Sequence, residues 1–282
     1  MRRQYWLFLV SLIIILGGLT GCASRLNSQK YVQETTPTLF FHGGGSSYHA
    51  EEHMAKAAKQ VGVTHTIIRA MVDTQGHVRL VGKIKPGAIN PIVEVNYANN
   101  KQMNYRTHGV WAINVVRALQ KQYHFKVINM VGHSLGNISL IYYSLEAQKQ
   151  QNLPKLRKQV DIAGHFAGLN FKQMPARVKQ PAGLRLNAAG KPNKMNETYR
   201  EMTQLRQTLP KNQIKVLNLY GNIGGHTDGT VPNVSTLSLK YLVKPRAKSY
   251  QEHEFTGKLA RHSKLHENPA VDRVLIHFLW EK

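Results

Sequence analysis

The residues of this chain that could carry out chemistry centre on Ser134, in the pentapeptide Gly132-His133-Ser134-Leu135-Gly136. A serine hydroxyl becomes a strong nucleophile only when a base takes its proton and the backbone holds its oxygen clear of neighbouring atoms. A Gly-X-Ser-X-Gly sequence between a strand and a helix meets the second requirement, because the serine lies on a sharp turn and the glycines leave room around it. An apolar run over residues 127–131 precedes this pentapeptide, and a helical pattern follows it. We therefore predict that Ser134 is a catalytic nucleophile.

A serine nucleophile of this kind needs a carboxylate and a histidine, which follow it along the chain in that order. The sequence has four aspartates, and three of them are poorly placed. Asp73 precedes the serine, Asp161 falls inside a predicted strand and Asp272 lies in the predicted last helix. Asp228 lies in a turn-rich loop directly after a predicted strand, where a carboxylate can reach the catalytic edge of a sheet. Asp228 is therefore the predicted acid.

The base is harder to choose, because the chain has 14 histidines. Those that follow Asp228 are His253, His262, His266 and His277. His253 falls in the predicted last strand and His277 in the last helix, which leaves two candidates on the loop between them. The base usually lies just before the final helix, so we predict His266, with His262 as the alternative.

Attack on an ester carbonyl creates an oxyanion, which preorganised backbone N–H groups stabilise. The N–H of Leu135, at the start of the predicted helix, can provide one donor. The loop His42-Gly43-Gly44-Gly45 can provide the other, because glycine allows the backbone to approach a substrate closely. We favour Gly44, with Gly43 as second choice.

The elements that must position these residues alternate between strand and helix. Such alternation predicts an α/β fold with a mainly parallel sheet covered by helices on both faces. Two β-rich runs separated by Asp73-Thr74-Gln75-Gly76 also predict a hairpin. The expected strands are residues 37–41, 66–72, 77–83, 92–97, 127–131, 159–163, 214–220 and 249–255, and the expected helices are 50–60, one around 111–119, 135–148 and 269–280.

The length of 282 residues suits one catalytic domain, which we place at residues 37–282. Over residues 171–215 the hydrophobic periodicity weakens, and the segment contains ten basic residues but only two acidic ones. We expect a cap-like insertion at about 168–213, over the carboxyl edge of the sheet, which could act as a lid. Residues 22–36 are polar and are predicted to be a tether.

The first 21 residues have the parts of a secretory signal peptide: two arginines, an apolar run and small residues at the end. Leu19-Thr20-Gly21-Cys22 resembles a bacterial lipobox, in which the cysteine is acylated and the signal is cut before it. Cys22 is the only cysteine of the chain, so an internal disulfide is excluded. We predict a lipid anchor at Cys22 on the outer face of the cell membrane; the alternative is an uncleaved membrane anchor with an incidental cysteine.

The formal net charge of the chain is +23. Such an excess attracts polyanions, and for an exported protein these are anionic lipid headgroups and cell-wall polymers. Neither aromatic-interleaved basic segments nor zinc-spaced cysteines are present, so nucleic-acid binding is not expected. The proposed chemistry requires no cofactor and no metal ion.

Five segments together resemble the lipase-like α/β-hydrolases of Gram-positive bacteria, a family of cell-surface hydrolases of unknown function. The resemblance covers nearly all of the mature chain. By position it implies an α/β-hydrolase fold, Ser134, Asp228 and His266 as the triad, and Gly44 and Leu135 in the oxyanion hole. The chain departs from the family pattern at two positions: His165 stands where proline is expected, and Asn137 where a small residue usually follows the turn. We therefore expect the wall of the pocket to differ from that of the family. The five segments are residues 41–45, 132–136, 161–168, 228–235 and 262–268.

Three functions remain open on these residues. The first is an extracellular serine hydrolase of the carboxylesterase or lipase type. The second is an acyltransferase that uses the same triad, since access to the pocket decides whether water or another acceptor resolves the acyl-enzyme. The third is a non-catalytic lipoprotein that binds anionic surfaces.

Overall fold

The computed structural model describes residues 26–282, in which eight strands form one sheet in the order β3-β2-β4-β1-β5-β6-β7-β8. Neighbouring strands are parallel except for the antiparallel pair of β2 and β3. The predicted mainly parallel sheet of an α/β fold is thus confirmed. The strands are β1 (Thr38–Phe41), β2 (Ile67–Val72), β3 (Val78–Val81), β4 (Ile92–Tyr97), β5 (Val127–His133), β6 (Lys155–Ile162), β7 (Lys215–Asn222) and β8 (Ser249–Thr256).

The predicted hairpin joins β2 to β3, and its turn follows from the side chain of Asp73. One carboxylate oxygen of Asp73 accepts hydrogen bonds from the N–H groups of Gln75 and His77, each at 2.9 Å. Gly76 closes the turn at a φ of 91°, a conformation that favours glycine. Local turn chemistry therefore fixes the antiparallel register at this edge of the sheet.

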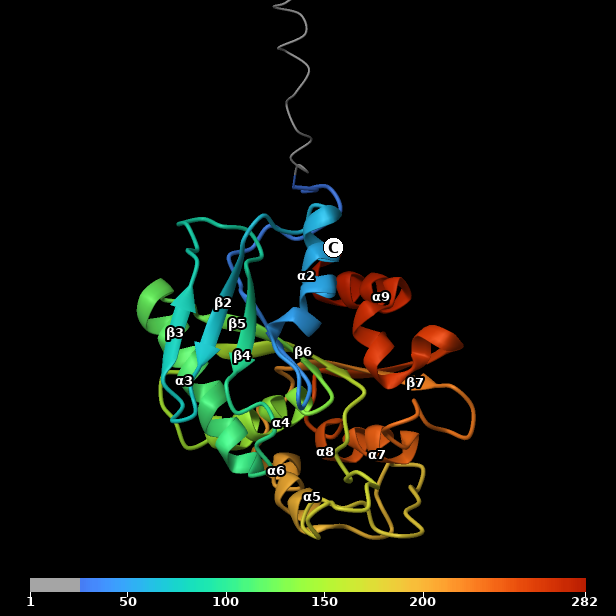
Figure 1. The fold of residues 1–282 in the computed structure, drawn as a ribbon. Helices are drawn as coiled ribbons and strands as arrows, with labels where there is room; N and C mark the ends of the chain where they lie inside the picture. The colour runs from blue at the N-terminus through green and yellow to red at the C-terminus, as the bar shows by residue number, and fades with distance from the viewer. Residues whose placement is uncertain (1–25) are drawn as a thin grey trace, which may run out of the picture.

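Helices cover both faces of the sheet, as Figure 1 shows. On one face α2 (Glu52–Gln60) and α9 (Pro269–Trp280) share an apolar cluster with the side chains of Phe40 and Val131. On the other face α3 (Tyr105–Tyr123) and α4 (Gly136–Ala147) pack with α7 (Asn233–Leu237) and α8 (Leu239–Val243). Three short 3-10 helices connect the layers: η1 (Tyr48–Ala50), η2 (Lys258–Ala260) and η3 (His262–Glu267).

The N-terminal segment that precedes β1 packs against the domain, contrary to the prediction of a tether over residues 22–36. Tyr31 is 3% exposed and forms an antiparallel bridge with Glu281. The N–H of Val32 donates to the carbonyl of Trp280 at 2.8 Å. An aromatic side chain that the sequence pattern left unassigned thus joins the segment to the end of α9. The predicted signal peptide, Cys22 and the first residues of the tether lie outside the described residues. Within residues 26–282, no helix has the length and apolar character needed to cross a bilayer.

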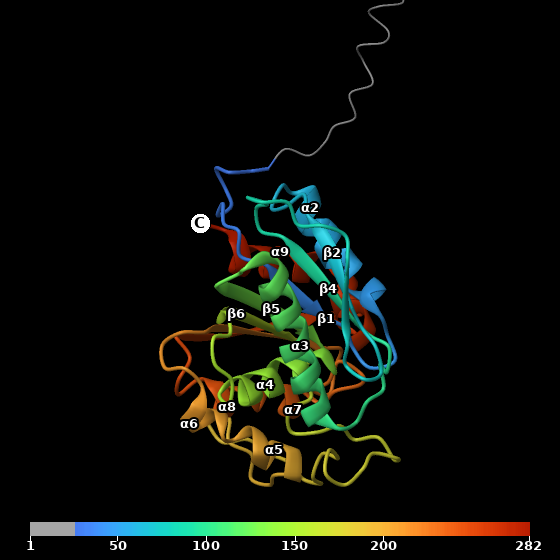
Figure 2. The same ribbon diagram turned by 90° about the vertical axis from the view of Figure 1, so that its left-hand side faces the viewer.

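The insertion at residues 168–213 carries two short helices, α5 (Glu197–Met202) and α6 (Leu205–Thr208). Both contact α4, and α6 contacts α8, so these two helices form an outer layer on that face (Figure 1 and Figure 2). Tyr199 is fully buried, and its hydroxyl donates to the carbonyl of Ser238 at 2.8 Å. Side chains of both helices therefore contribute to the apolar core of the domain.

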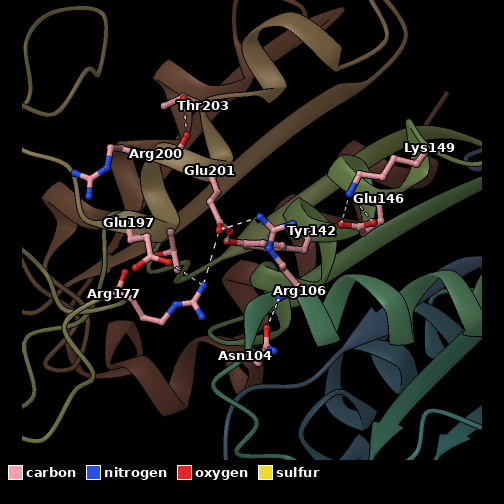
Figure 3. Close-up of polar contacts among 11 residues, drawn as sticks. Asn104, Arg106, Tyr142, Glu146, Lys149, Arg177, Glu197, Arg200, Glu201 and Thr203 are labelled. Atoms are coloured by element: carbon pink, nitrogen blue, oxygen red, sulfur yellow. Dashed lines mark hydrogen bonds and ion pairs between the residues drawn. The ribbon is translucent and has the colours of Figure 1, made fainter.

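An ionic network fastens the insertion to the helices beneath it (Figure 3). Glu201 of α5 accepts hydrogen bonds from Arg106 of α3 at 3.0 Å and from the hydroxyl of Tyr142 of α4 at 2.8 Å. Arg177, within the insertion, pairs with Glu197 at 3.4 Å and lies 3.9 Å from Glu201. One carboxylate thus connects the insertion to both α3 and α4.

Candidate active site

Ser134 lies between the end of β5 and the start of α4, as the sequence predicts, with a backbone φ of 52°. A non-glycine residue in this left-handed conformation is strained, and such strain is concentrated at functional sites. The flanking glycines make the turn possible. A Cβ on Gly136 would lie 2.0 Å from the carbonyl oxygen of Phe41, and one on Gly132 would lie 2.7 Å from the backbone nitrogen of Asn137. Both positions therefore exclude any larger residue.

Asn137, one of the two departures from the family pattern, stabilises this turn through the hydrogen bonds of its side chain. Its side-chain amide donates to the carbonyl of Ser134 at 2.9 Å and to that of Ile162 at 2.8 Å. Its side-chain oxygen accepts from the N–H of Ile162 at 3.2 Å. Asn137 is fully buried, so every polar atom of its side chain has a role within the fold. The residue fastens the serine turn to the end of β6 rather than forming a pocket wall.

His262 is the histidine that reaches Ser134. Its Nε2 lies 2.9 Å from the Ser134 Oγ, and its Nδ1 lies 2.7 Å from the Asp228 Oδ2. Because a carboxylate only accepts hydrogen bonds, Nδ1 carries the proton and Nε2 is free to accept one from the serine. The three side chains form a continuous hydrogen-bonded line in the order Ser134, His262, Asp228.

The prediction that His266 occupies this position is wrong. His266 lies one turn further along η3, and its ring packs 4.7 Å from that of His133, centre to centre. Its buried Nδ1 has no hydrogen-bond partner among the described residues. The expectation that the base lies directly before the last helix failed because η3 separates His262 from α9. The first histidine of η3, His262, faces the serine, whereas His266, which is nearer to α9, does not.

The loop that follows β7 presents Asp228 to the base. The Asp228 Oδ1 accepts from the N–H groups of Thr230 at 2.8 Å and Val231 at 2.7 Å, which leaves Oδ2 for His262. The main chains are joined as well, since the His262 N–H donates to the Asp228 carbonyl at 2.9 Å. The side chain of Asp228 is only 2% exposed, so its charge is held by directed hydrogen bonds rather than by water.

The other aspartates are engaged elsewhere. The Asp161 carboxyl is enclosed in β6, where its oxygens lie 2.9 and 3.1 Å from the side-chain amide of Gln159, and burial raises its pKa to about 8. Asp272 pairs with His53 at 2.8 Å. Asp73 shapes the hairpin turn described above.

The predicted oxyanion donors lie next to the serine. The N–H of Leu135 has no acceptor within the described residues. A Cβ on Gly43 would lie 3.2 Å from the Ser134 Cβ, and one on Gly44 would lie 3.2 Å from the Leu135 Cδ2. The glycine loop and the serine turn therefore approach each other closely, with Gly43 beside Ser134 and Gly44 beside Leu135.

His42, for which the sequence pattern predicts no role, holds this loop in place. Its Nδ1 donates to the carbonyl of Gly43 at 2.8 Å, and its Nε2 accepts from the N–H of Tyr97 at 3.1 Å. Only a neutral imidazole can donate at one nitrogen and accept at the other, and burial lowers the pKa of His42 accordingly. The signal available in the sequence was its position directly after β1 and before three glycines.

His165, the other departure from the family pattern, lies in the loop after β6 and is 1% exposed. Its Nδ1 is 3.4 Å from the hydroxyl of Tyr105, and burial lowers its pKa to about 4. His165 makes no hydrogen bond to the three aligned side chains. Across residues 26–282, no three His, Cys, Asp or Glu side chains converge as ligands for a metal ion.

Comparison with known proteins places the chain in a family. The model of the family described as "Alpha/beta hydrolase of unknown function (DUF915)" matches residues 25–282. No curated protein matches the sequence.

Solved structures share the fold. The product of the Listeria innocua gene lin2722 is 24% identical with a TM-score of 0.75, and the alignment covers 87% of this chain and 94% of the other. A protein of Lactobacillus plantarum WCFS1, provisionally named a cell surface hydrolase, is 19% identical with a TM-score of 0.64, covering 88% and 91%. A bromoperoxidase of Bacillus anthracis is 12% identical with a TM-score of 0.50, covering 88% and 93%. The fold is therefore that of the α/β hydrolases, and the chain belongs to the DUF915 family of α/β hydrolases of unknown function.

Proposed function

We propose that this hydrolase is a serine esterase that cleaves carboxylic esters through an acyl-enzyme. The observation that carries the proposal is the hydrogen-bonded line from the Ser134 Oγ through His262 to the Asp228 carboxylate, with distances of 2.9 and 2.7 Å. A strained serine at a strand-to-helix turn and the unpaired N–H of Leu135 beside it support the same chemistry, because acyl transfer requires both.

In the proposed reaction, the Ser134 Oγ attacks the ester carbonyl carbon while the His262 Nε2 takes its proton. The carbonyl oxygen becomes an oxyanion, which accepts hydrogen bonds from the N–H of Leu135 and from the glycine loop, at Gly44 or Gly43. Collapse of this intermediate breaks the bond to the alcohol, which leaves with the proton from His262. A water molecule then attacks the acyl-enzyme, gives its proton to His262 and releases the acid, and Ser134 regains its proton.

Asp228 acts on the base rather than on the substrate. Its carboxylate accepts a hydrogen bond from the Nδ1–H of His262, so it selects the tautomer whose Nε2 can receive the serine proton. It also stabilises the imidazolium that forms during each proton transfer. The two backbone N–H donors on its other oxygen keep the carboxylate in place.

A fluorophosphonate probe tests the nucleophile directly. We expect the protein to become labelled and to hydrolyse short p-nitrophenyl esters, and we expect Ser134→Ala to lose both properties. Ser263→Ala is the matched control, since Ser263 is exposed and follows His262 directly in the chain. Labelling of Ser134→Ala at the wild-type level would refute the assignment. A wild type that is neither labelled nor active would instead favour the non-catalytic alternative.

We propose in addition that the protein acts outside the cell, anchored by lipid at Cys22. The lipobox-like sequence supports this location, as does the name of the Lactobacillus plantarum neighbour. Metabolic labelling with palmitate should tag the wild type and not Cys22→Ala. Retention of label in that variant would remove the anchor.

We also propose that the basic insertion binds anionic polymers of the cell wall. The described chain begins at the pole of the molecule opposite α5 and its adjoining loops (Figure 1 and Figure 2). A lipid at Cys22 would therefore direct the insertion away from the membrane. Salt-sensitive binding of poly(glycerol phosphate) should weaken in Lys179→Glu/Lys191→Glu and persist in Lys83→Glu/Lys121→Glu, all four residues being exposed. Equal weakening in both double variants would show only a general charge effect.

A further inference from the structure

His133 lies where the serine turn, the glycine loop and the loop of the base meet. It is the last residue of β5 and directly precedes Ser134. Its ring centre is 5.0 Å from that of His262 and 4.7 Å from that of His266. A Cβ on Gly43 would come within 3.1 Å of its Nδ1. The side chain is therefore enclosed by the segments that must keep a common geometry during catalysis.

The contact that gives His133 a specific role is made with the backbone of the base. Its Nε2 lies 3.0 Å from the carbonyl oxygen of His262. A carbonyl can only accept, so the Nε2 of His133 carries the proton. The N–H of His262 donates to the carbonyl of Asp228 at 2.9 Å. The backbone of His262 is therefore held at both of its polar groups. Its N–H donates to Asp228, and its carbonyl accepts from His133.

The charge state of His133 suits this task. Its ring is enclosed by protein, and burial lowers its pKa well below the usual range, with the neighbouring His262 and His266 acting in the same direction. A neutral ring has a single N–H, which is used on the His262 carbonyl. It also adds no second positive charge next to the imidazolium that His262 becomes during proton transfer.

We propose that His133 is a positioning residue, whose hydrogen bond to the His262 carbonyl holds the base within reach of the Ser134 Oγ. The inference rests on the proposed esterase function, because it concerns how fast the serine proton is transferred. It assigns to the residue before the nucleophile a task other than filling space. Since His133 contacts no substrate atom in this scheme, its loss acts on kcat and leaves KM nearly unchanged.

Two amide variants separate the hydrogen bond from the volume of the side chain. Glutamine places its amide nitrogen about where the Nε2 of histidine lies, whereas the shorter asparagine cannot reach that point. We expect His133→Asn to lower kcat by about 10- to 100-fold, since misplacing a catalytic group by about 1 Å costs up to about 100-fold. We expect His133→Gln to retain most of the activity. His266→Asn is the matched control, because it makes the same change in the adjacent, partly buried ring, which has no hydrogen bond to Ser134, His262 or Asp228.

A spectroscopic measurement keeps the test independent of turnover. The Nδ1 proton between His262 and Asp228 gives a downfield proton resonance in NMR, which should be retained in His133→Gln and His266→Asn. In His133→Asn it should broaden or shift while thermal unfolding remains cooperative. If His133→Asn does not fold, the inference depends on His133→Gln, which must then retain both the resonance and most of kcat.

Equal kcat in the asparagine and glutamine variants would overturn the inference, as would an equal loss in His133→Asn and His266→Asn, which would indicate packing alone. The failure of the proposed function looks different. In that case the wild type hydrolyses no ester and does not react with a fluorophosphonate, while the NMR comparison still reports whether His133 holds the base.

Discussion

The fully buried carboxyl of Glu51 should make the folded protein less stable as the pH rises. Glu51 precedes α2 and is 0% exposed, and neither of its oxygens has a hydrogen-bond partner among the described residues. Burial is the main cause that raises its pKa from 4.5 to about 8, and the nearby Glu94 carboxylate adds to the rise. The folded state therefore favours the protonated acid, whereas the unfolded chain ionises it readily.

The sign and the size of the effect follow from these two pKa values. A raised pKa means that stability is fully present below pH 4.5 and is lost as the pH rises through about 8. Between pH 5 and pH 9 the loss amounts to about 4 kcal/mol for this one group, at about 1.4 kcal/mol per pKa unit. Glu51→Gln cannot ionise, so its free energy of unfolding should vary less with pH by about that amount.

Urea unfolding of the wild type and Glu51→Gln at pH 5, 7 and 9 measures this difference. The buried, unpaired amide of the glutamine lowers the free energy of unfolding by the same amount at every pH. The test therefore compares how the free energy of unfolding changes with pH in the two proteins, rather than its absolute value. Glu52→Gln is the control on the adjacent residue. A hydrogen bond from Lys56 lowers the pKa of Glu52, so removing that charge should not flatten the profile. Parallel profiles for the wild type and Glu51→Gln would refute the reasoning.

Three further predictions concern the site. Asp228→Asn should lower kcat by about 10⁴-fold, because an amide that donates to the His262 Nδ1 enforces the wrong tautomer; rescue by a change of pH alone would contradict this. In ester hydrolysis assays, His262→Ala should lose at least about 10³-fold in kcat while His266→Ala stays within about threefold, and the reverse order would restore the sequence-based assignment. Gly136→Ala should give little folded protein by circular dichroism, since its Cβ would lie 2.0 Å from the Phe41 carbonyl oxygen; a stable, active variant would show that β1 can move.

The parts of the fold that the sequence predicted are those governed by local pattern. Apolar runs such as residues 127–131 marked buried strands, and α9 has the bounds that the sequence predicted. In the structure the side chain of Asn268 caps this helix and Pro269 is its first residue. The β2–β3 hairpin followed from Asp73 and Gly76. Glycine spacing also placed Ser134 on its turn, since only glycine tolerates the approach of β1.

Other features were decided by contacts between distant segments. The polar segment before β1 packs on the domain because Tyr31 finds a buried position beside α9. The helices of the insertion rest on α4 because Tyr142 and Arg106 both reach Glu201. Asn137 serves the turn rather than a pocket because the end of β6 lies next to it. In each case the partner lies too far along the chain for periodicity or turn chemistry to identify.

The sequence by itself singled out Ser134 and Asp228 as the proposed nucleophile and acid, because the glycine pattern is local and aspartates are scarce. It also limited the base to two histidines four residues apart. Only the tertiary structure decided between them. His262 is held by Asp228, 34 positions away, and by His133, 129 positions away, and these bonds orient η3 so that the first of its two histidines faces the serine.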